Sequence, residues 1–274
     1  MLEQFRAVTR QKLQNAVAEV VSESERRRAD HDDARNNALA ERLEDRLDSL
    51  AAELATVRRS LADLERSARR DIGRALDVGA AQESAAFVVA EMAQAERFAA
   101  PAETLRFALT ETKVDGLVLE FGVASGGTLR IISDAVPQRR PVYGFDVFTG
   151  LPETWRTGFP AGEFAQETVP EVHGAEIVAG LFEDTLPDFL AARPGPVAFL
   201  HLDADLYSST KTVLDLVADR LVPGSVIVFD EFFNFPGWRE HEFRAWTEFT
   251  QRTGVRFEYL AYTVNDEQVV ARIV

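Results

Sequence analysis

Two pairs of carboxylates in the second half of the chain have the residue types and the spacing of metal ligands. Asp203 and Asp205 stand two residues apart, directly after an apolar run. Asp230 and Glu231 follow the next apolar run in the same way. Four carboxylates at one place repel one another unless a cation or shared protons relieve the charge, and ligand sets made only of oxygen favour Mg²⁺, Ca²⁺ or Mn²⁺. The two pairs therefore predict a divalent metal site.

Other ways to satisfy these acids stay open. Ion pairs to Lys211 or Arg239 are the structural alternative, although neither base lies inside the acidic segments. The chain has no cysteine, which excludes disulfides, thiolate zinc sites, iron–sulfur clusters and a cysteine nucleophile. A metal bound here is therefore one that oxygen ligands hold.

A glycine-rich turn at residues 119–128 precedes the acids in the chain. Gly122, Gly126 and Gly127 let the backbone approach a ligand and offer amide groups at the start of a helix. Their spacing differs from the Gly-x-Gly-x-x-Gly that suits a pyrophosphate. Glu120 repels a phosphate but suits a cationic ligand such as a sulfonium amino acid. The turn therefore predicts a cationic cofactor, with a purely structural turn as the alternative.

Three later residues suit the rest of such a cofactor. Asp146 stands 19 residues after Gly127, close to the spacing at which an acid accepts hydrogen bonds from ribose hydroxyls. Helix capping is the alternative role for this acid. Gly180 and Phe182 follow the next apolar run and suit the two sides of an adenine ring.

Strands and helices must alternate to position these residues. We expect strands at 117–121, 142–146, 176–179, 197–203, 226–230, 257–263 and 268–274, and helices at 84–97, 102–112, 128–136, 185–192, 209–221 and 240–253. This order predicts an α/β fold with a doubly wound, mostly parallel sheet and helices on both faces. Residues 264–267 are too short a link for a parallel crossover, so the last strand must run antiparallel. Ligands of such sheets bind at the carboxyl ends of the strands, where the acids and glycines lie.

The first 75 residues have a different composition, with 15 acids, 15 bases and Phe5 as their single aromatic residue. Seven apolar residues follow one another at alternating steps of four and three: Leu43, Leu47, Leu50, Leu54, Val57, Leu61 and Leu64. This repeat predicts a left-handed coiled coil and a homo-oligomer. An amphipathic helix that packs on the rest of the chain is the alternative.

The domains follow from this change of composition. We expect a helical coiled-coil leader at 1–75 and a second domain at 76–274, with a helical lead-in at 76–115 and an α/β core at 116–274. The net charge of −15 argues against a nucleic-acid partner. No secretory signal and no membrane span are found in the sequence, so we expect a cytoplasmic protein.

Taken together, the motifs resemble class I S-adenosylmethionine-dependent methyltransferases, and within them the macrocin O-methyltransferase family. The resemblance covers residues 100–274 and includes the antiparallel last strand. It rests on the turn at 117–127, on Asp146, on the run 202–207 and on 229–231. It implies a Rossmann-like fold and Mg²⁺-dependent methylation of a hydroxyl on a small molecule or sugar.

The resemblance also implies roles for individual residues. The implied cofactor residues are Glu120, Gly122, Ser125, Gly126, Gly127, Thr128, Asp146, Phe182 and Asp203. The implied metal ligands are Asp203, Asp230 and Glu231. Catechol-type and caffeoyl-CoA-type enzymes place a lysine base just after the first metal Asp, and no lysine stands there in this sequence. Asp205 is therefore the expected base beside Asp203, with His201 and His241 as weaker candidates.

Substrate contacts are expected from loops 154–166 and 234–238, which are rich in aromatic residues. Two other functions stay open. A nicotinamide-dependent oxidoreductase needs glycines that bind a pyrophosphate, and Glu120 counts against it. A non-catalytic coiled-coil scaffold with a cofactor-binding domain is the other alternative, and the four carboxylates count against it.

Overall fold

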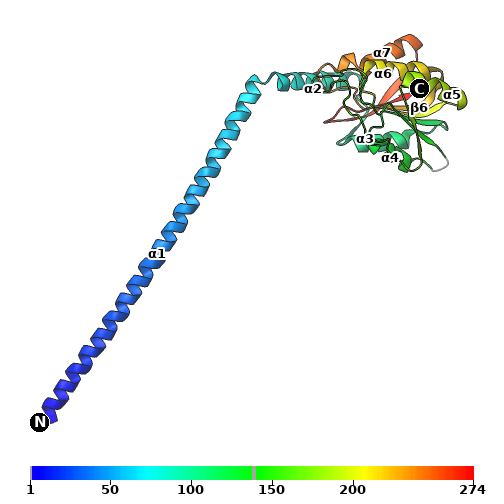
Figure 1. Ribbon diagram of the computed structural model, residues 1–274. Coiled ribbons are helices and arrows are strands. Elements are labelled where there is room, and N and C mark those ends of the chain that lie inside the picture. The colour runs from blue at the N-terminus through cyan, green and yellow to red at the C-terminus, as the bar shows by residue number, and fades with distance from the viewer. Residues whose placement is uncertain (1, 138–139) are drawn as a thin grey trace. The chain divides into compact units, whose positions relative to one another are not determined.

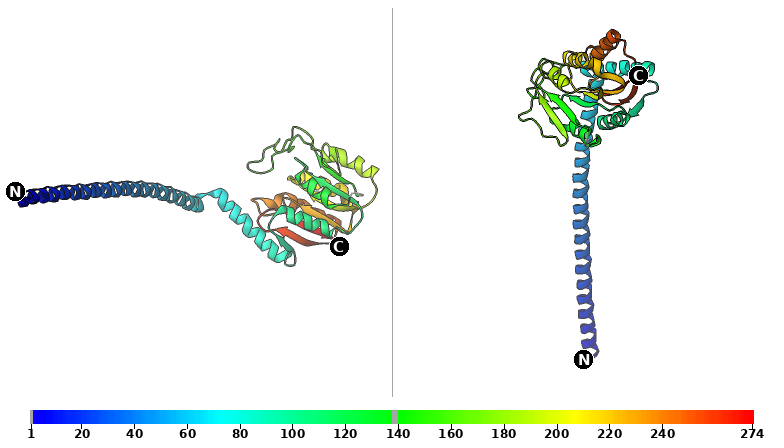
Figure 2. Two further views of the ribbon diagram at one scale, coloured as in Figure 1. Left: turned by 90° about the horizontal axis from the view of Figure 1, so that it is seen from below. Right: turned by 90° about the vertical axis from the view of Figure 1, so that its right-hand side faces the viewer.

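The computed structural model describes residues 2–137 and 140–274, and only the backbone of residues 2–9 and 11. The chain divides into two compact units, Met1–Asp71 and Ile72–Val274. The first unit is a single helix, α1 (Leu2–Arg70), which is continuous in Figures 1 and 2. Its 69 residues include no glycine or proline, and Ala, Leu, Arg and Glu, which favour helix, dominate. Among the described residues, no helix is long and apolar enough to cross a membrane.

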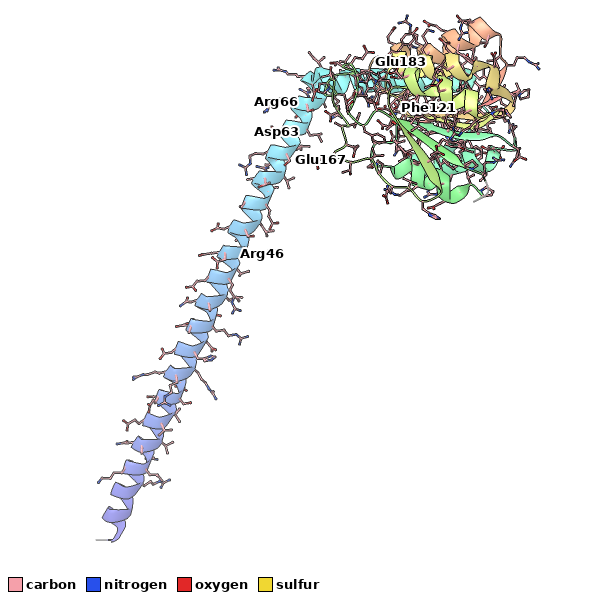
Figure 3. The ribbon with its side chains drawn as sticks, turned by 45° about the vertical axis from the view of Figure 1, so that its right-hand side comes forward. Arg46, Asp63, Arg66, Phe121, Glu167 and Glu183 are labelled. Atoms are coloured by element: carbon pink, nitrogen blue, oxygen red, sulfur yellow. The ribbon has the colours of Figure 1, made fainter. Side chains whose placement is uncertain are left out.

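The described side chains of α1 from Lys12 to Arg70 are exposed, except for the partly exposed Ser67. Its seven repeating apolar side chains, Leu43 to Leu64, are between 44 % and 64 % exposed. Charged side chains such as Arg46, Asp63 and Arg66 project from the helix in Figure 3, and ion pairs such as Arg66–Asp63 stay within it. The described part of the chain therefore leaves the apolar stripe uncovered.

The second unit is an α/β domain. Its helices are α2 (Ile72–Glu91), α3 (Pro101–Glu111), α4 (Gly127–Ala135), α5 (Phe182–Ala192), α6 (Tyr207–Val217) and α7 (Glu242–Thr253), with short 3₁₀ helices at Ala218–Arg220 and Trp238–Glu240. Its strands are β1 (Glu96–Phe98), β2 (Leu117–Phe121), β3 (Val142–Asp146), β4 (Ala175–Ala179), β5 (Val197–Leu202), β6 (Leu221–Phe229), β7 (Phe257–Thr263) and β8 (Val269–Ile273).

All eight strands form one sheet in the order β1-β7-β8-β6-β5-β2-β3-β4. Strand β8 runs antiparallel to both of its neighbours, and every other pairing is parallel. Helices α3 and α4 cover one face of the sheet, and α5, α6 and α7 cover the other (Figure 1). The predicted fold class, with its antiparallel last strand, is confirmed.

Two predicted helix ends are wrong. The helix expected at 84–97 ends at Glu91, and Glu96–Phe98 instead forms strand β1 beside β7. The helix expected at 209–221 ends as α6 at Val217, and Leu221 begins strand β6. In both cases the strand is stabilised by a partner far away in the sequence, which local periodicity does not report.

The strand register sets the position of the site. Phe121 of β2 pairs with Leu202 of β5, and Leu202 pairs with Phe229 of β6. All three strands therefore end at the same level. The residues that follow them emerge side by side at the carboxyl edge of the sheet.

Candidate active site

An acidic cluster lies at this edge. Ligand oxygens of Asp203, Asp205 and Glu231 all lie within 4.8 Å of one another. The backbone N–H groups of Asp203 and Asp230 fix the two segments, since they donate to Phe121 O and Leu202 O at 2.8 Å. Of the predicted metal ligands, the structure therefore brings Asp203 and Glu231 together and adds Asp205.

The carboxylate of Asp230 has other neighbours. It accepts from Gln268 Nε2 at 3.3 Å and lies 3.4 Å from His201 Nε2. The two basic residues that could have paired with these acids have other partners: Lys211 pairs with Asp215, and Arg239 pairs with Glu83. Ion pairs with lysine or arginine at these positions therefore do not explain the cluster.

Burial makes negative charge in this cluster costly. Desolvation, followed by repulsion from neighbouring acids, raises the pKa of Asp203 and Glu231 well above the usual range. Desolvation also raises the pKa of Asp205 to about 7, although nearby Arg156 opposes the rise. A bound cation removes this cost.

A buried histidine connects the cluster to the glycine-rich turn. His201 Nδ1 lies 2.9 Å from Glu120 Oε1, and both side chains are essentially inaccessible to solvent. Desolvation lowers the pKa of His201, but hydrogen bonds to Asp230 and Glu120 outweigh it and raise the pKa well above the usual value. Desolvation raises the pKa of Glu120, and His201 opposes that rise. Glu120, His201 and Asp230 thus form a buried chain across β2, β5 and β6.

Asp146 organises the glycine-rich turn. Its Oδ2 accepts from the backbone N–H of Val123 at 2.9 Å and of Ala124 at 2.7 Å, and its Oδ1 accepts from Phe148 N–H at 2.7 Å. A carboxylate has about four acceptor positions, so three backbone bonds leave one. Val123 and Ala124 precede α4, and the N-cap of α4, Gly126, has no side-chain cap bond, so Asp146 holds the turn and does not cap that helix. The ribose role stays a prediction.

Gly122 is required where the turn crosses the acidic segment. Its φ is +94°, and a Cβ there would lie 1.7 Å from the backbone oxygen of Asp203. Only glycine lets the two segments approach so closely.

A cavity of about 580 Å³ opens beside both segments. The residues predicted for the cofactor, the metal or the base that line it are Gly122, Asp146, Gly180, Phe182, Asp203, Asp205 and Glu231. The other predicted residues lie outside this described lining: Glu120, Ser125, Gly126, Gly127, Thr128 and Asp230. For Glu120 the reason is complete burial behind the turn.

Trp155, Arg156 and Phe159 form part of the cavity wall, whereas no residue of the predicted substrate loop 234–238 belongs to the described lining. Arg156 stacks on Trp155 at 3.8 Å and on Phe235 at 4.4 Å. Its Nη1 also donates to both carboxylate oxygens of Glu267 at 3.0 Å. These contacts tie the loop after β3 to the turn between β7 and β8. Sequence analysis missed Arg156 and Glu267, because 111 residues separate them and no local pattern marks either one.

The two histidines proposed as weaker bases have different surroundings. His201 is buried in the chain described above, away from the cavity lining. His241 is half-buried beside Trp155 and Phe235, and burial lowers its pKa. Among the described residues, Asp205 is the candidate base that lines the cavity.

A mostly parallel sheet with one reversed strand, and with a glycine-rich turn and an acidic cluster at its carboxyl edge, is a Rossmann-like fold. Residues 119–232 match the family model Methyltransf_24, described as a methyltransferase domain. The matched range contains the turn, Asp146 and all four carboxylates. The predicted resemblance to class I S-adenosylmethionine-dependent methyltransferases is confirmed.

Two known proteins are similar to parts of the chain. The 8-demethyl-8-(2,3-dimethoxy-α-L-rhamnosyl)-tetracenomycin-C 4′-O-methyltransferase of Streptomyces olivaceus is 42 % identical over 53 residues, which are 19 % of this chain and 19 % of that protein. The structure of CalS11, calicheamicin methyltransferase, aligns with 25 % identity and a TM-score of 0.52, over 62 % of this chain and 77 % of that one. A second structure, of apo CalS11, describes it as a TDP-rhamnose 3′-O-methyltransferase, with 23 % identity, a TM-score of 0.47 and coverage of 62 % and 78 %.

Proposed function

We propose that this protein transfers the methyl group of S-adenosylmethionine to a hydroxyl oxygen of a sugar or sugar-bearing small molecule, with a divalent cation, Mg²⁺ above all, at the acidic cluster. The observation that carries the proposal is the convergence of Asp203, Asp205 and Glu231 on one cavity with the glycine-rich turn. The sugar as substrate is supported by the rhamnosyl 4′-O-methyltransferase that shares 42 % identity over 53 residues.

The cavity floor is suited to hold the cofactor. S-adenosylmethionine supplies a methyl group on a positively charged sulfur. Gly122 and Ala124 present backbone on this side, and Asp146 keeps an acceptor position for a ribose hydroxyl. Phe182 begins α5 at the cavity wall and suits an adenine ring. Gly126, Gly127, Ser125 and Thr128 shape the turn and the start of α4 from outside the lining.

The acidic cluster fits a divalent cation. Glu231 Oε2 is buried and, among the described residues, has no hydrogen-bond partner. The ligand atoms that the cluster offers to a metal ion are all carboxylate oxygens, which Mg²⁺ and Ca²⁺ prefer. Asp203, Asp230 and Glu231 would hold the ion, in line with the family resemblance. A bound Mg²⁺ supplies positive charge that lowers the pKa of a substrate hydroxyl.

Asp205 is the proposed base. Its carboxylate lines the cavity, and its pKa of about 7 lies close to neutral pH, where a proton acceptor works best. It would take the proton of the hydroxyl as the oxygen attacks the methyl carbon. The wall formed by Trp155 and Phe159 would exclude water and orient the acceptor in line with the sulfur–carbon bond that breaks.

A second ligand arrangement follows from the geometry. The carboxylate that lies within 4.8 Å of both Asp203 and Glu231 is that of Asp205, and not that of Asp230. Titration calorimetry with Mg²⁺ distinguishes the two sets. If Asp230 is the third ligand, Asp230→Asn weakens Mg²⁺ binding and Asp205→Asn retains it while turnover falls. The reverse result assigns Asp205 to the metal.

The deciding experiment follows methyl transfer from labelled S-adenosylmethionine to a panel of rhamnosides and TDP-sugars. We expect EDTA to abolish transfer, Mg²⁺ to restore it, and cofactor binding to survive chelation. Asp203→Asn should lower kcat/KM by a factor that corresponds to a loss of about 3–5 kcal/mol of transition-state stabilisation. Transfer that is equally active in excess EDTA would contradict the metal assignment. Binding of NAD in place of S-adenosylmethionine would favour the oxidoreductase alternative.

A further inference from the structure

The apolar stripe of α1 has the form of one side of a two-helix seam. In heptad notation the a positions are Ala40, Leu47, Leu54, Leu61 and Ala68, and the d positions are Leu43, Leu50, Val57 and Leu64. Polar and small residues such as Asp45, Ala52 and Arg59 occupy the opposite face. N-terminal to Ala40 the repeat stops, because Asp33 and Asn36 stand at the next a and d positions.

The exposure of this seam calls for a covering partner. Its seven large apolar side chains are 44–64 % exposed, and burial of each one against a partner would stabilise the assembly. Helices in water owe most of their stability to packing of an apolar face. A second copy of the same chain offers the same repeat, so the seam is self-complementary.

We propose that α1 pairs with a second copy of this chain as a parallel, in-register coiled coil over residues 40–68. The charges beside the seam favour this orientation. In the parallel register Glu53 at g faces the partner's Arg58 at e, and symmetry repeats the contact. The remaining g–e′ contacts in this register join a charged residue to Leu, Ala or Ser, so none is repulsive.

Antiparallel pairing brings like charges together. With Leu54 opposite the partner's Val57, Glu44 faces the partner's Glu65 in two symmetric contacts. With Leu54 opposite the partner's Leu50, Glu53 faces the partner's Glu53, although Glu44 then faces the partner's Arg58 in two attractive contacts. Each of these registers therefore has at least one repulsive contact, and the parallel register has none.

The absence of cysteine from the chain allows a direct test. We introduce Leu47→Cys and Leu64→Cys separately into the full-length protein, with Ala52→Cys on the outer face as the matched control. After mild oxidation, we expect each seam variant alone to form a disulfide dimer on a non-reducing gel, roughly 10-fold faster than the control. Circular dichroism of the reduced variants checks that α1 stays helical.

Other outcomes overturn the proposal. Cross-linking only when the two seam variants are mixed would show antiparallel pairing. Equal rates for the seam variants and Ala52→Cys, or a monomer by sedimentation at micromolar concentration, would show that α1 does not self-associate. None of these readouts depends on methyl transfer, so they leave the proposed function untouched.

Charge exchange provides a second measurement. Arg58→Glu should weaken association several-fold, and adding Glu53→Arg in the same chain should restore it, because the pair is rebuilt only in the parallel register. Failure of the double variant to recover would contradict the parallel register even if the helix stays folded.

Discussion

Replacing Asp205 with asparagine should make the α/β domain more stable at alkaline pH while it removes the proposed base. The side chain is 6 % exposed, and its pKa is raised from an ordinary 3.8 to about 7, chiefly by desolvation. Its backbone φ of +58° is left-handed, a conformation that asparagine tolerates better than most residues. The variant therefore tests the charge with little backbone strain.

The magnitude follows from linkage between proton binding and folding. Because the folded state binds the proton more tightly than the unfolded state, stability is greatest at low pH and falls as pH rises from about 4 to about 7. A pKa rise of this size corresponds to about 4 kcal/mol in total, of which about 2–3 kcal/mol develops between pH 5 and pH 8. Asp205→Asn should remove this part of the decrease in the free energy of unfolding. It should also remove the repulsion that the Asp205 carboxylate exerts on Asp203 and Glu231.

Tryptophan fluorescence during urea unfolding measures this domain alone, since Trp155, Trp238 and Trp246 are the three tryptophans of the chain and all lie within residues 72–274. Without metal, the free energy of unfolding should fall more steeply from pH 5 to pH 8 in wild type than in Asp205→Asn. Asp188→Asn, at an exposed position of α5, is the control and should follow wild type. Identical slopes for wild type and Asp205→Asn would refute the reasoning.

Three further substitutions test other parts of the site, and a fourth, at Gly79, is a control. Asp146→Ala should weaken S-adenosylmethionine binding by about 1–3 kcal/mol in calorimetry; an unchanged dissociation constant would contradict the cofactor assignment. Gly122→Ala should cost about 3 kcal/mol or more of stability because its Cβ meets the Asp203 backbone at 1.7 Å, whereas Gly79→Ala, with nothing within 4 Å, should stabilise α2 by about 1 kcal/mol. His201→Phe should cost about 3–5 kcal/mol in thermal unfolding, since it leaves two buried acids without their shared partner; a variant as stable as wild type would show that the buried chain is unimportant for folding.

Much of the fold could be predicted because its signals are local. Strands β2, β3 and β7 fall on the predicted ranges, since each is a short apolar run bounded by turn residues. The reversed last strand followed from the length of one link. Strand β1 could not be predicted, because three residues become a strand only through pairing with β7, far along the chain.

The site could be predicted to the level of segments but not of side-chain partners. Acids at adjacent strand ends were expected to converge, and Asp203, Asp205 and Glu231 do so. The direction of the Asp230 carboxylate depends on His201 and Gln268, from two other segments. Likewise, the cofactor role of Glu120 stays a prediction, and its burial against His201 could not be predicted because it depends on the register of β2 and β5.

The ion pair between Arg156 and Glu267 affects how the loop after β3 can open. Arg156 and Glu267 side chains are 23 % and 19 % exposed, so opening of the loop after β3 breaks two charge-assisted hydrogen bonds and separates Arg156 from Trp155 and Phe235 in one event. Opening of this loop therefore has to break the ion pair and the stacking contacts together. If the loop must open before the cavity empties, the exchange of bound molecules would depend on two residues that lie far apart in the sequence.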